Sequence, residues 1–278
     1  MTYSESIVIR LPDNYESYAR LWMPDSSRGA ILYLHGIQSH GGWFEMSAQR
    51  LAEAGFAVLL PDRRGSGRND KQRGHIPSLR QILRDTSEYL DELHVRTGNN
   101  QFHVIGVSWG GKLAAAMMQY APARIKSLTL VGPGLFPKID LKFTQKLRVG
   151  LTALIAKKSL FDIPLNDPKL FTENRLRQEF IANDPLTLHQ VTTSFLLASR
   201  KMDRYLRGIL RNRQGCPLRV FLAGKDRIID NNKTKDFIRR LSWPSREITE
   251  YDEAHHTLEF EPDPEPFFKD LVSWIKQC

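Results

Sequence analysis

The stretch Phe102–Tyr120, FHVIGVSWGGKLAAAMMQY, decides the fold of this chain. Its first six residues form a short apolar run typical of a buried strand, and its last nine are rich in Ala and Met, as in a helix. Between them, Gly106-Val107-Ser108-Trp109-Gly110 matches the pattern G-x-S-x-G, in which glycines let strand and helix approach closely around a sharply turned serine. The stretch predicts a strand–turn–helix unit that presents the Ser108 hydroxyl at the carboxyl edge of a sheet.

A glycine-rich turn with a capping serine would give the same pattern, so partner residues must support a catalytic role. A serine hydroxyl is a poor nucleophile unless a base takes its proton and an acid orients that base. In sheets built around such a turn, the acid and then the histidine follow the serine along the chain. Asp226 follows the apolar run LRVFLA, and His255-His256 follow the run REITEY. Asp226 is therefore the expected acid, with Asp230 and Asp252 as rivals, and either histidine can be the base.

Strand-like and helix-like segments alternate on both sides of this unit. Strands are expected at Gly29–Leu34, Phe56–Leu60, Phe102–Val107, Ile125–Val131, Leu218–Ala223 and Arg246–Tyr251. Helices are expected at Trp43–Ala54, Leu79–Val95, Lys112–Tyr120, Lys233–Leu241 and Pro266–Lys276. A hairpin of Ser6–Pro12 and Tyr15–Met23, with Asp13-Asn14 as its turn, comes first. This alternation predicts an α/β fold, a mostly parallel sheet with helices on both faces.

The segment Leu135–Asn212 interrupts the alternation, because it shows helical periodicity and no clear strand. Its expected helices are Leu141–Lys157, Glu173–Ala182 and Leu186–Leu210. We interpret residues 135–212 as a helical cap (lid) over the ligand-binding edge of a core formed by residues 1–134 and 213–278. The segment contains 14 Lys and Arg against 7 Asp and Glu. It has no nucleic-acid-binding motif, so we expect a solvated or anion-attracting surface, with weak contact to anionic membranes as one outcome.

Composition and residue spacing indicate which broad classes of protein are not expected. The chain has 278 residues, a formal net charge of +9 and 41% hydrophobic residues, all compatible with a globular enzyme. No run approaches the roughly 20 apolar residues of a membrane span, and Met1–Arg10 does not resemble a secretory signal. Two cysteines, Cys216 and Cys278, are too few for a disulfide framework, so a cytoplasmic protein is expected. No Cys/His spacing predicts a metal site, and no cofactor is expected.

An oxyanion hole would complete the site. His35-Gly36 ends a predicted strand, and the loop that follows is expected to supply the backbone N–H of Ile37. Trp109, next to the serine, is expected to supply the second N–H. His35 itself is expected to be structural, and five histidines have no evident partner: His40, His75, His94, His103 and His189.

The cap is expected to determine the substrate. Nine of its apolar residues either line an acyl-chain pocket or pack cap helices together: Phe136, Phe143, Leu147, Leu151, Leu154, Ile155, Phe161, Phe195 and Leu196.

Seven short segments together resemble one enzyme family, the monoacylglycerol lipase and lysophospholipase branch of the α/β-hydrolases, which often bears the serine aminopeptidase (S33) label. They are His35-Gly36, LAEAGF (51–56), PDRRGSGR (61–68), GVSWGG (106–111), FIANDPL (180–186), AGKDRIID (223–230) and HTLE (256–259). The resemblance covers nearly the whole chain from about Ser6. In this family a Thr/Val-Leu-type pair usually follows the histidine, which favours His256 over His255. The resemblance therefore implies a triad of Ser108, Asp226 and His256.

The implied activity is hydrolysis of a carboxylic ester through an acyl-enzyme, with a lipid-like substrate such as a monoacylglycerol or lysophospholipid. Small-molecule carboxylesterase, thioesterase, aminopeptidase and cofactor-free haloperoxidase activities remain alternatives, as does a catalytically idle binding protein. Two departures leave the substrate open: Ile37–Gly42 differs from the usual small-plus-acidic loop, and Arg63 and Ser66 replace residues usual in the family. Both departures are expected near the pocket entrance. Asp62 and Arg64 are expected to form a structural network.

Overall fold

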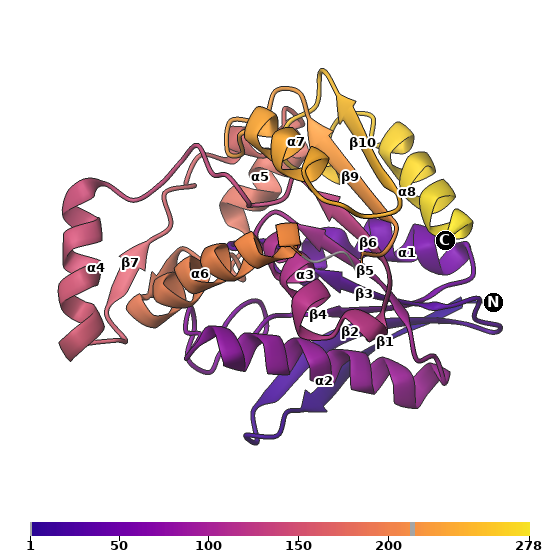
Figure 1. Cartoon of the computed structure of the whole chain (residues 1–278), viewed down its shortest axis with the longest axis horizontal. Coiled ribbons are helices and arrows are strands. Elements are labelled where there is room, and N and C mark those ends of the chain that lie inside the picture. Colours follow the sequence, from indigo (N-terminus) through magenta and orange to yellow (C-terminus); the bar gives the residue numbers. More distant parts are fainter. Residues whose placement is uncertain (1, 212–214) are drawn as a thin grey trace.

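The computed structural model describes residues 2–211 and 215–278. The predicted cap boundary at Asn212–Arg213 lies outside the described residues. An eight-stranded sheet runs through the molecule in the order β1-β2-β4-β3-β5-β6-β9-β10 (Figure 1). Its strands are β1 Thr2–Arg10, β2 Glu16–Pro24, β3 Ala30–Leu34, β4 Ala57–Pro61, β5 Phe102–Val107, β6 Ile125–Val131, β9 Leu218–Ala223 and β10 Arg246–Tyr251. The β1–β2 hairpin pairs antiparallel to β4, and every later pairing in this sheet is parallel.

Helices cover both faces of this sheet. They are η1 Gly41–Phe44, α1 Glu45–Glu53, α2 Leu79–Thr97, α3 Trp109–Tyr120, η2 Pro122–Arg124, α7 Asn231–Arg239, η5 Leu258–Phe260 and α8 Glu265–Gln277. One buried cluster joins α2, α3 and α7 through Leu90, Leu113 and Ile238, while the other joins α1 and α8 through Leu51 and Leu271. The predicted fold class, a mostly parallel sheet between two helical layers, is confirmed. Because six adjoining strands share one direction from β4 to β10, their carboxyl ends meet at one edge.

The segment between β6 and β9 forms a separate group of elements, which we call the insertion (residues 135–211). It contains α4 Phe143–Ile155, β7 Leu160–Asp162, η3 Pro168–Leu170, α5 Arg175–Asn183, β8 Gln190–Thr192, α6 Thr193–Leu206 and η4 Arg207–Arg211. Figure 1 shows α4 and β7 projecting to one side of the main sheet, farthest from the N-terminus.

The insertion differs from the sequence prediction in two respects. β7 and β8 pair antiparallel, where no strand was expected, and α6 begins at Thr193 instead of Leu186. Strands of three residues are too short to show alternation, and their pairing joins residues about thirty positions apart. The start of α6 is fixed by the Thr192 side chain, which accepts a hydrogen bond from the Phe195 amide.

No helix in the described part of the chain combines the length and apolar composition needed to span a membrane. Cys216 and Cys278 are both free thiols. Within residues 2–211 and 215–278, no group of three His, Cys, Asp or Glu side chains is arranged to hold a metal ion.

Candidate active site

Ser108 sits in a sharply strained turn between β5 and α3. Its backbone has φ 53° and ψ −119°, a positive-φ conformation that is costly for a residue with a side chain. The flanking glycines make this turn possible. A Cβ on Gly106 would lie 2.4 Å from the Gly110 carbonyl oxygen, and one on Gly110 would lie 2.3 Å from the Leu34 carbonyl oxygen. The spacing G-x-S-x-G is therefore a steric requirement of bringing β3, β5 and α3 together.

The backbone of Ser108 is held by the turn that follows β6. Its N–H donates to the Val131 carbonyl (2.9 Å), and its carbonyl accepts from the Gly134 N–H (2.7 Å). The side chain is half-buried, and its hydroxyl makes no hydrogen bond within the part of the chain that the structure describes. The strained turn thus leaves the oxygen of Ser108 without an internal partner.

Asp226 and His256 form a buried pair, each only 2% exposed. His256 Nδ1 lies 2.7 Å from Asp226 Oδ2, while Asp226 Oδ1 accepts from the amides of Ile228 and Ile229 (2.8 and 2.9 Å). Burial alone would raise the pKa of Asp226, but the neighbouring His256 and the two amides outweigh it and lower the pKa. An ionised carboxylate only accepts hydrogen bonds, so His256 carries a hydrogen on Nδ1, and the neutral form of this ring has Nε2 as its acceptor.

The free nitrogen of His256 is also buried. Nε2 has no hydrogen-bond partner among the described residues. A Cβ on Gly132 would lie 3.3 Å from Cε1 of this ring, and Gly132 directly follows Val131, whose carbonyl holds the Ser108 amide. The imidazole and the serine therefore both contact the turn 131–134, although no hydrogen bond joins their side chains in the described structure.

The rival candidates for base and acid, His255, Asp230 and Asp252, do not join the Asp226–His256 pair. His255 lies 3.3 Å from both Glu261 and Glu173, on separate ring nitrogens. Asp230 caps α7 by accepting from the Lys233 amide, and Asp252 is exposed. None of them is joined to Asp226 or His256 by a side-chain hydrogen bond in the described residues.

The two predicted oxyanion amides flank Ser108. Trp109 is the first residue of α3, so its N–H has no partner within the helix. Ile37 lies in the loop after β3, where a Cβ on Gly36 would lie only 3.4 Å from Ser108 Cβ. Neither amide donates a backbone hydrogen bond in the described structure. An oxyanion hole requires two such N–H groups facing one point beside the serine, and these two amides remain the predicted pair.

His35 is a structural residue of this loop, as the sequence indicates. Its Nε2 accepts from the Arg63 amide (2.8 Å) and its Nδ1 lies 2.9 Å from the Gly36 carbonyl. Burial and the nearby Arg63 guanidinium hold the pKa of His35 well below its usual value, so the ring is neutral. Arg63 and Ser66 are buried beside it (5% and 0% exposed), and their expected place near a pocket entrance stays a prediction.

Asp62 and Arg64 anchor the following turn. Asp62 accepts from the amides of Gly41 and Arg68, and Arg64 pairs with Asp85 at 2.7 Å. The predicted structural network is confirmed.

The contacts that Asp184 of the insertion makes with the core are among those that the sequence did not predict. His40 Nε2 and Trp43 Nε1 both donate to Asp184 Oδ2, at 2.9 and 2.7 Å. Burial would raise the pKa of Asp184, but these two donors outweigh it and hold the pKa well below the ordinary value. The sequence signal available was the Asn183-Asp184-Pro185 turn, which does not reveal a partner more than 140 residues away.

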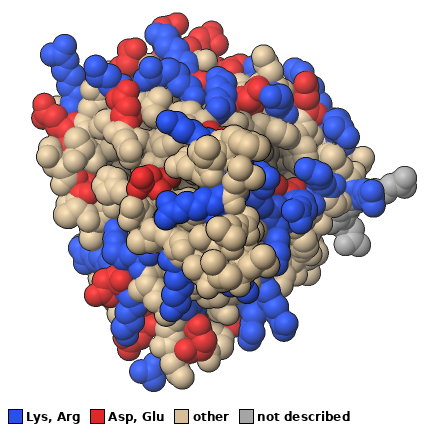
Figure 2. All heavy atoms as spheres, turned by 90° about the vertical axis from the view of Figure 1, so that its left-hand side faces the viewer, with Lys and Arg blue, Asp and Glu red and all other residues tan. Residues whose placement is uncertain are grey.

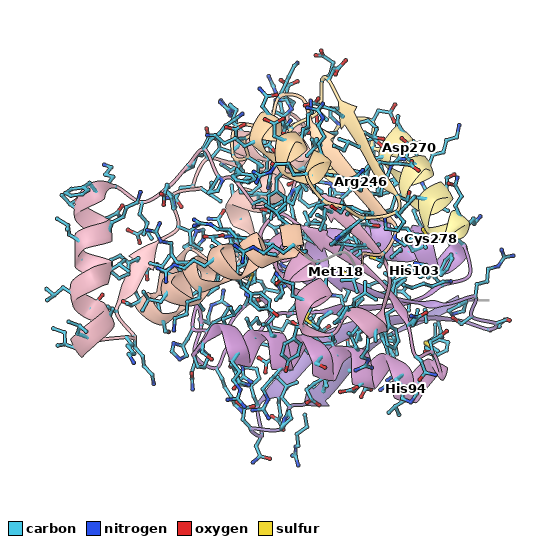
Figure 3. All side chains as sticks on the ribbon, viewed as in Figure 1. His94, His103, Met118, Arg246, Asp270 and Cys278 are labelled. Atoms are coloured by element: carbon cyan, nitrogen blue, oxygen red, sulfur yellow. The ribbon has the colours of Figure 1, made fainter. Side chains whose placement is uncertain are left out.

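The remaining four histidines, His75, His94, His103 and His189, are not joined to Ser108, Asp226 or His256 by a side-chain hydrogen bond in the described residues. His103 is buried against Ser127 (2.7 Å), whereas His94 is exposed on α2, and Figure 3 shows both on the side of the molecule away from α4. His75 is 3.0 Å from Ser194, and His189 is exposed.

Of the nine apolar residues predicted for the insertion, Phe136 borders a cavity described below and Leu196 is half-buried, while the other seven divide into two groups. Phe161 and Phe195 are buried, and Phe195 stacks on Trp109 at 5.2 Å between ring centroids. Five on α4 instead face outward, with exposures of 60% to 84%: Phe143, Leu147, Leu151, Leu154 and Ile155. Because these five side chains are largely exposed, they are not packed in the interior of the insertion, and neither sequence expectation holds for them.

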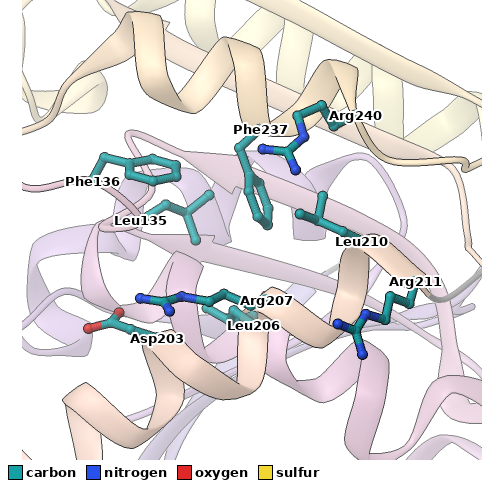
Figure 4. Close-up of a pocket in the computed structure, with 9 residues that line it drawn as sticks. All are labelled: Leu135, Phe136, Asp203, Leu206, Arg207, Leu210, Arg211, Phe237 and Arg240. Atoms are coloured by element: carbon teal, nitrogen blue, oxygen red, sulfur yellow. The ribbon is translucent and has the colours of Figure 1, made fainter.

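A cavity of 690 Å³ lies between α6, η4, α7 and the segment after β6, bordered by Leu135, Phe136 and Phe237 (Figure 4). Its arginines are Arg207, Arg211 and Arg240, and its one acid, Asp203, pairs with Lys112 at 2.6 Å. Ser108 and His256 are not among its lining residues, so this cavity is separate from the candidate active site.

Comparison with known proteins places the chain in a family. The family model described as "Serine aminopeptidase, S33" matches residues 25–263. The monoacylglycerol lipase of Mycolicibacterium smegmatis is 25% identical, over 92% of this chain and 91% of that protein. YnbC of Escherichia coli, an uncharacterized protein, is 26% identical over 95% of this chain, which spans 46% of YnbC. The crystal structure of Paleococcus ferrophilus monoacylglycerol lipase superimposes with a TM-score of 0.84 at 21% identity, covering 94% and 98% of the two chains.

The fold is thus that of an α/β-hydrolase. The chain belongs to the serine aminopeptidase S33 family, and its relatives in sequence and structure include lipases and esterases.

Proposed function

We propose that this protein hydrolyses carboxylic esters through a covalent acyl-enzyme, with Ser108 as nucleophile, His256 as base and Asp226 as its orienting acid. The observation that carries the proposal is the buried His256 ring. Asp226 fixes its tautomer, and its Nε2 has no partner in the described structure, beside a serine held in a strained turn. A buried imidazole nitrogen without a partner is costly unless it serves a reacting group.

The proposed reaction has two steps. The Ser108 oxygen attacks the ester carbonyl carbon while its proton passes to His256 Nε2, and the carbonyl electron pair moves onto the oxygen facing Ile37 N–H and Trp109 N–H. The bond to the alcohol then breaks, and the alcohol leaves with the proton from His256. Water attacks the acyl-enzyme, giving its proton to His256, and Ser108 recovers that proton as the acid is released. Every group this route needs is a side chain or an amide of the chain.

The substrate class we propose is a single-chain acyl ester, such as a monoacylglycerol or lysophospholipid. In support, the lipase relative matches over 91% of its own length, and the insertion covers residues next to Ser108, as Phe195 on Trp109 illustrates. We propose that the insertion acts as the cap that selects this chain. An aminopeptidase would have to bind a substrate ammonium, which the excess of Lys and Arg in residues 135–212 disfavours.

Two adjacent histidines provide a matched test of the proposed site. His256→Ala should lower kcat for p-nitrophenyl butyrate by about 10⁴-fold, as should Ser108→Ala, whereas His255→Ala should stay within about tenfold of the wild type. Ser26→Ala changes an exposed serine outside the proposed site, and as a control it should keep the kcat of the wild type. A fluorophosphonate should label the wild type and His255→Ala, and it should label the variants with reduced kcat correspondingly less. Turnover or labelling that survives Ser108→Ala in pure protein would overturn the proposal.

A substrate panel tests the chemical class. Monoacylglycerols and lysophospholipids should be hydrolysed with higher kcat/KM than acetyl esters or amino-acyl p-nitroanilides, because the apolar chain adds binding energy in a cap. A preference for the anilides would favour the aminopeptidase alternative instead.

We also propose that α4 docks on anionic membrane surfaces, where such lipids are found. Its five exposed apolar residues recur at helical spacing along one face, and Lys142, Arg148 and Lys157 lie on or beside the helix. Figure 2, which views the molecule from the side of α4, shows uncharged surface flanked by Lys and Arg. An apolar helix face bordered by cations is the pattern that lies in an anionic bilayer interface.

The docking proposal has its own control. Leu154→Glu should reduce co-sedimentation with phosphatidylglycerol vesicles severalfold, since Leu154 is 84% exposed. Leu176→Glu on α5, at a leucine 75% exposed, should not. Equal binding by both variants and the wild type, or no binding by the wild type at low salt, would exclude this surface.

A further inference from the structure

Arg63 is an unusual buried cation. The residue is 5% exposed, and within the described part of the chain no carboxylate lies within ion-pair distance of its guanidinium. Burial lowers its pKa to about 10, which still leaves the group charged at neutral pH. Buried charges are normally paired, because an unpaired charge is costly to remove from water. The free-energy cost of burying the Arg63 charge therefore has to be offset by the interactions that the guanidinium makes.

The guanidinium instead binds the loop that carries Ile37. Nη1 donates to the Gly36 carbonyl at 2.9 Å and Nη2 donates to the Ile37 carbonyl at 3.0 Å. The Arg63 backbone N–H also holds His35, whose Nδ1 contacts the same Gly36 carbonyl. Arg63 therefore holds two successive peptide carbonyls by two direct hydrogen bonds, and a third bond positions the His35 ring that contacts one of them.

Peptide geometry converts these bonds into an orientation of Ile37 N–H. The Gly36 carbonyl and the Ile37 amide belong to one planar trans peptide unit, in which C=O and N–H point in opposite directions. Because Arg63 and His35 hold the oxygen, the N–H is directed away from them. If the unit rotated, both bonds to Gly36 O would break. Arg63 thus prevents the flipped state in which a carbonyl, instead of an amide, would face the oxyanion.

The same guanidinium also contacts the second oxyanion residue. Its carbon lies 4.8 Å from the ring centroid of Trp109 and 5.3 Å from that of Phe195. Trp109 supplies the other predicted amide, so a single planar cation spans both halves of the predicted hole. A fixed positive charge that makes no direct ion pair with a carboxylate in the described residues favours negative charge developing nearby in a low-dielectric interior.

We propose that Arg63 is a positioning residue of the oxyanion hole: it locks the Gly36–Ile37 peptide with its N–H toward Ser108, and its positive charge favours the oxyanion. This inference rests on the proposed function and adds to it the origin of the hole's geometry. Its effect is confined to the charged transition state, because the neutral ester needs neither the locked amide nor the cation.

Three variants at position 63 and a matched neighbour test the inference. Arg63→Met keeps an apolar stem but removes charge and both donors, and kcat should fall about 10²–10³-fold with KM changed less than about threefold. Arg63→Gln keeps a hydrogen-bond donor without the charge, and Arg63→Lys keeps the charge without the bidentate hydrogen bonds. Both variants should therefore have kcat values between those of the wild type and Arg63→Met. Arg64→Met, at an equally buried arginine that pairs with acids away from the loop, should retain kcat per labelled serine.

Inhibitor binding separates positioning from general damage. A trifluoromethyl ketone adds the Ser108 oxygen to its carbonyl and so creates an oxyanion, whereas the matching alkyl ether creates none. Arg63→Met should lose ketone affinity in proportion to kcat while ether affinity stays the same. Activities are normalised to the fraction of protein with native near-ultraviolet circular dichroism, and Arg63→Lys provides the milder variant if Met fails to fold.

The outcomes are distinct. Wild-type kcat and ketone affinity in folded Arg63→Met or Arg63→Gln would overturn the inference while leaving the proposed function intact. Equal losses of ketone and ether affinity would also overturn it, because they indicate a collapsed site instead of a misdirected amide. Full activity of Ser108→Ala would overturn the proposed function and this inference together.

Discussion

Glu259 should give the protein a pH-dependent stability that a single isosteric change removes. The carboxyl lies three residues after His256, is 2% exposed, and accepts a hydrogen bond from Ser47 at Oε2 (2.5 Å). Its other oxygen has no partner in the described structure. Burial raises the pKa of Glu259 to about 8, although Ser47 opposes the rise. At neutral pH the folded protein therefore holds this carboxyl mainly protonated.

The sign of the effect follows from proton binding. Between the ordinary value of 4.5 and about 8, the folded state keeps a proton that the unfolded state has released, so rising pH removes stability across that window. At roughly 1.4 kcal/mol per pKa unit, the loss from about pH 5 to about pH 8.5 is about 4 kcal/mol. Glu259→Gln keeps the shape but does not titrate. Relative to the wild type, it should therefore gain about 4 kcal/mol over that interval.

The assay is urea unfolding of both proteins at the two pH values, with the free energy of unfolding extrapolated to water. Ser47→Ala is the control, because it removes the bond that opposes the rise and should move the window to higher pH. A difference between Glu259→Gln and the wild type that stays constant with pH would refute the reasoning, and a change of the opposite sign would show that the folded carboxyl is ionised.

Further predictions concern the turn, the insertion and the proposed acid. Gly110→Ala would put a Cβ 2.3 Å from the Leu34 carbonyl, so unfolding free energy should fall by ~1–3 kcal/mol and the calorimetric Tm with it; an unchanged Tm would contradict the close packing. Asp184→Asn weakens the bonds from His40 and Trp43, so the insertion should be proteolysed sooner than the core; equal rates would contradict its anchoring role. Asp226→Asn should lower kcat about 10⁴-fold by releasing the His256 tautomer, and near-normal kcat would point to another acid.

Much of the core could be predicted because its signals are local. Buried strands such as Ile125–Val131 and Leu218–Ala223 are apolar runs bounded by breakers, and the structure has both with the expected bounds. The Ser108 turn was predictable because its glycines are required by contacts within a few residues and with one adjacent strand. Local periodicity also located α2 and α8 to within about two residues.

What the sequence did not predict depends on contacts between distant segments. β7 and β8 are too short to carry a pattern, and their pairing depends on the chain between them folding back. The apolar face of α4 has ordinary amphipathic spacing, and the spacing cannot tell whether protein or solvent covers that face. The bond from His40 to Asp184 likewise joins loops that only the folded insertion brings together.

The candidate site could be predicted in part, because some of its residues carry a sequence signal and others do not. Asp226 and His256 are thirty residues apart, yet strand order predicts that both reach one edge, because both follow strands of one parallel sheet. The choice of His256 over His255 came from the family resemblance. Arg63 also follows such a strand, β4, and lies at the same edge, but nothing in the sequence distinguishes it from Arg64 beside it. Arg64 contacts acids and Arg63 contacts carbonyls, because successive side chains leave the turn in different directions. Strand order therefore predicts which residues reach the edge, whereas the turn geometry decides which of two neighbouring arginines contacts the loop that carries Ile37.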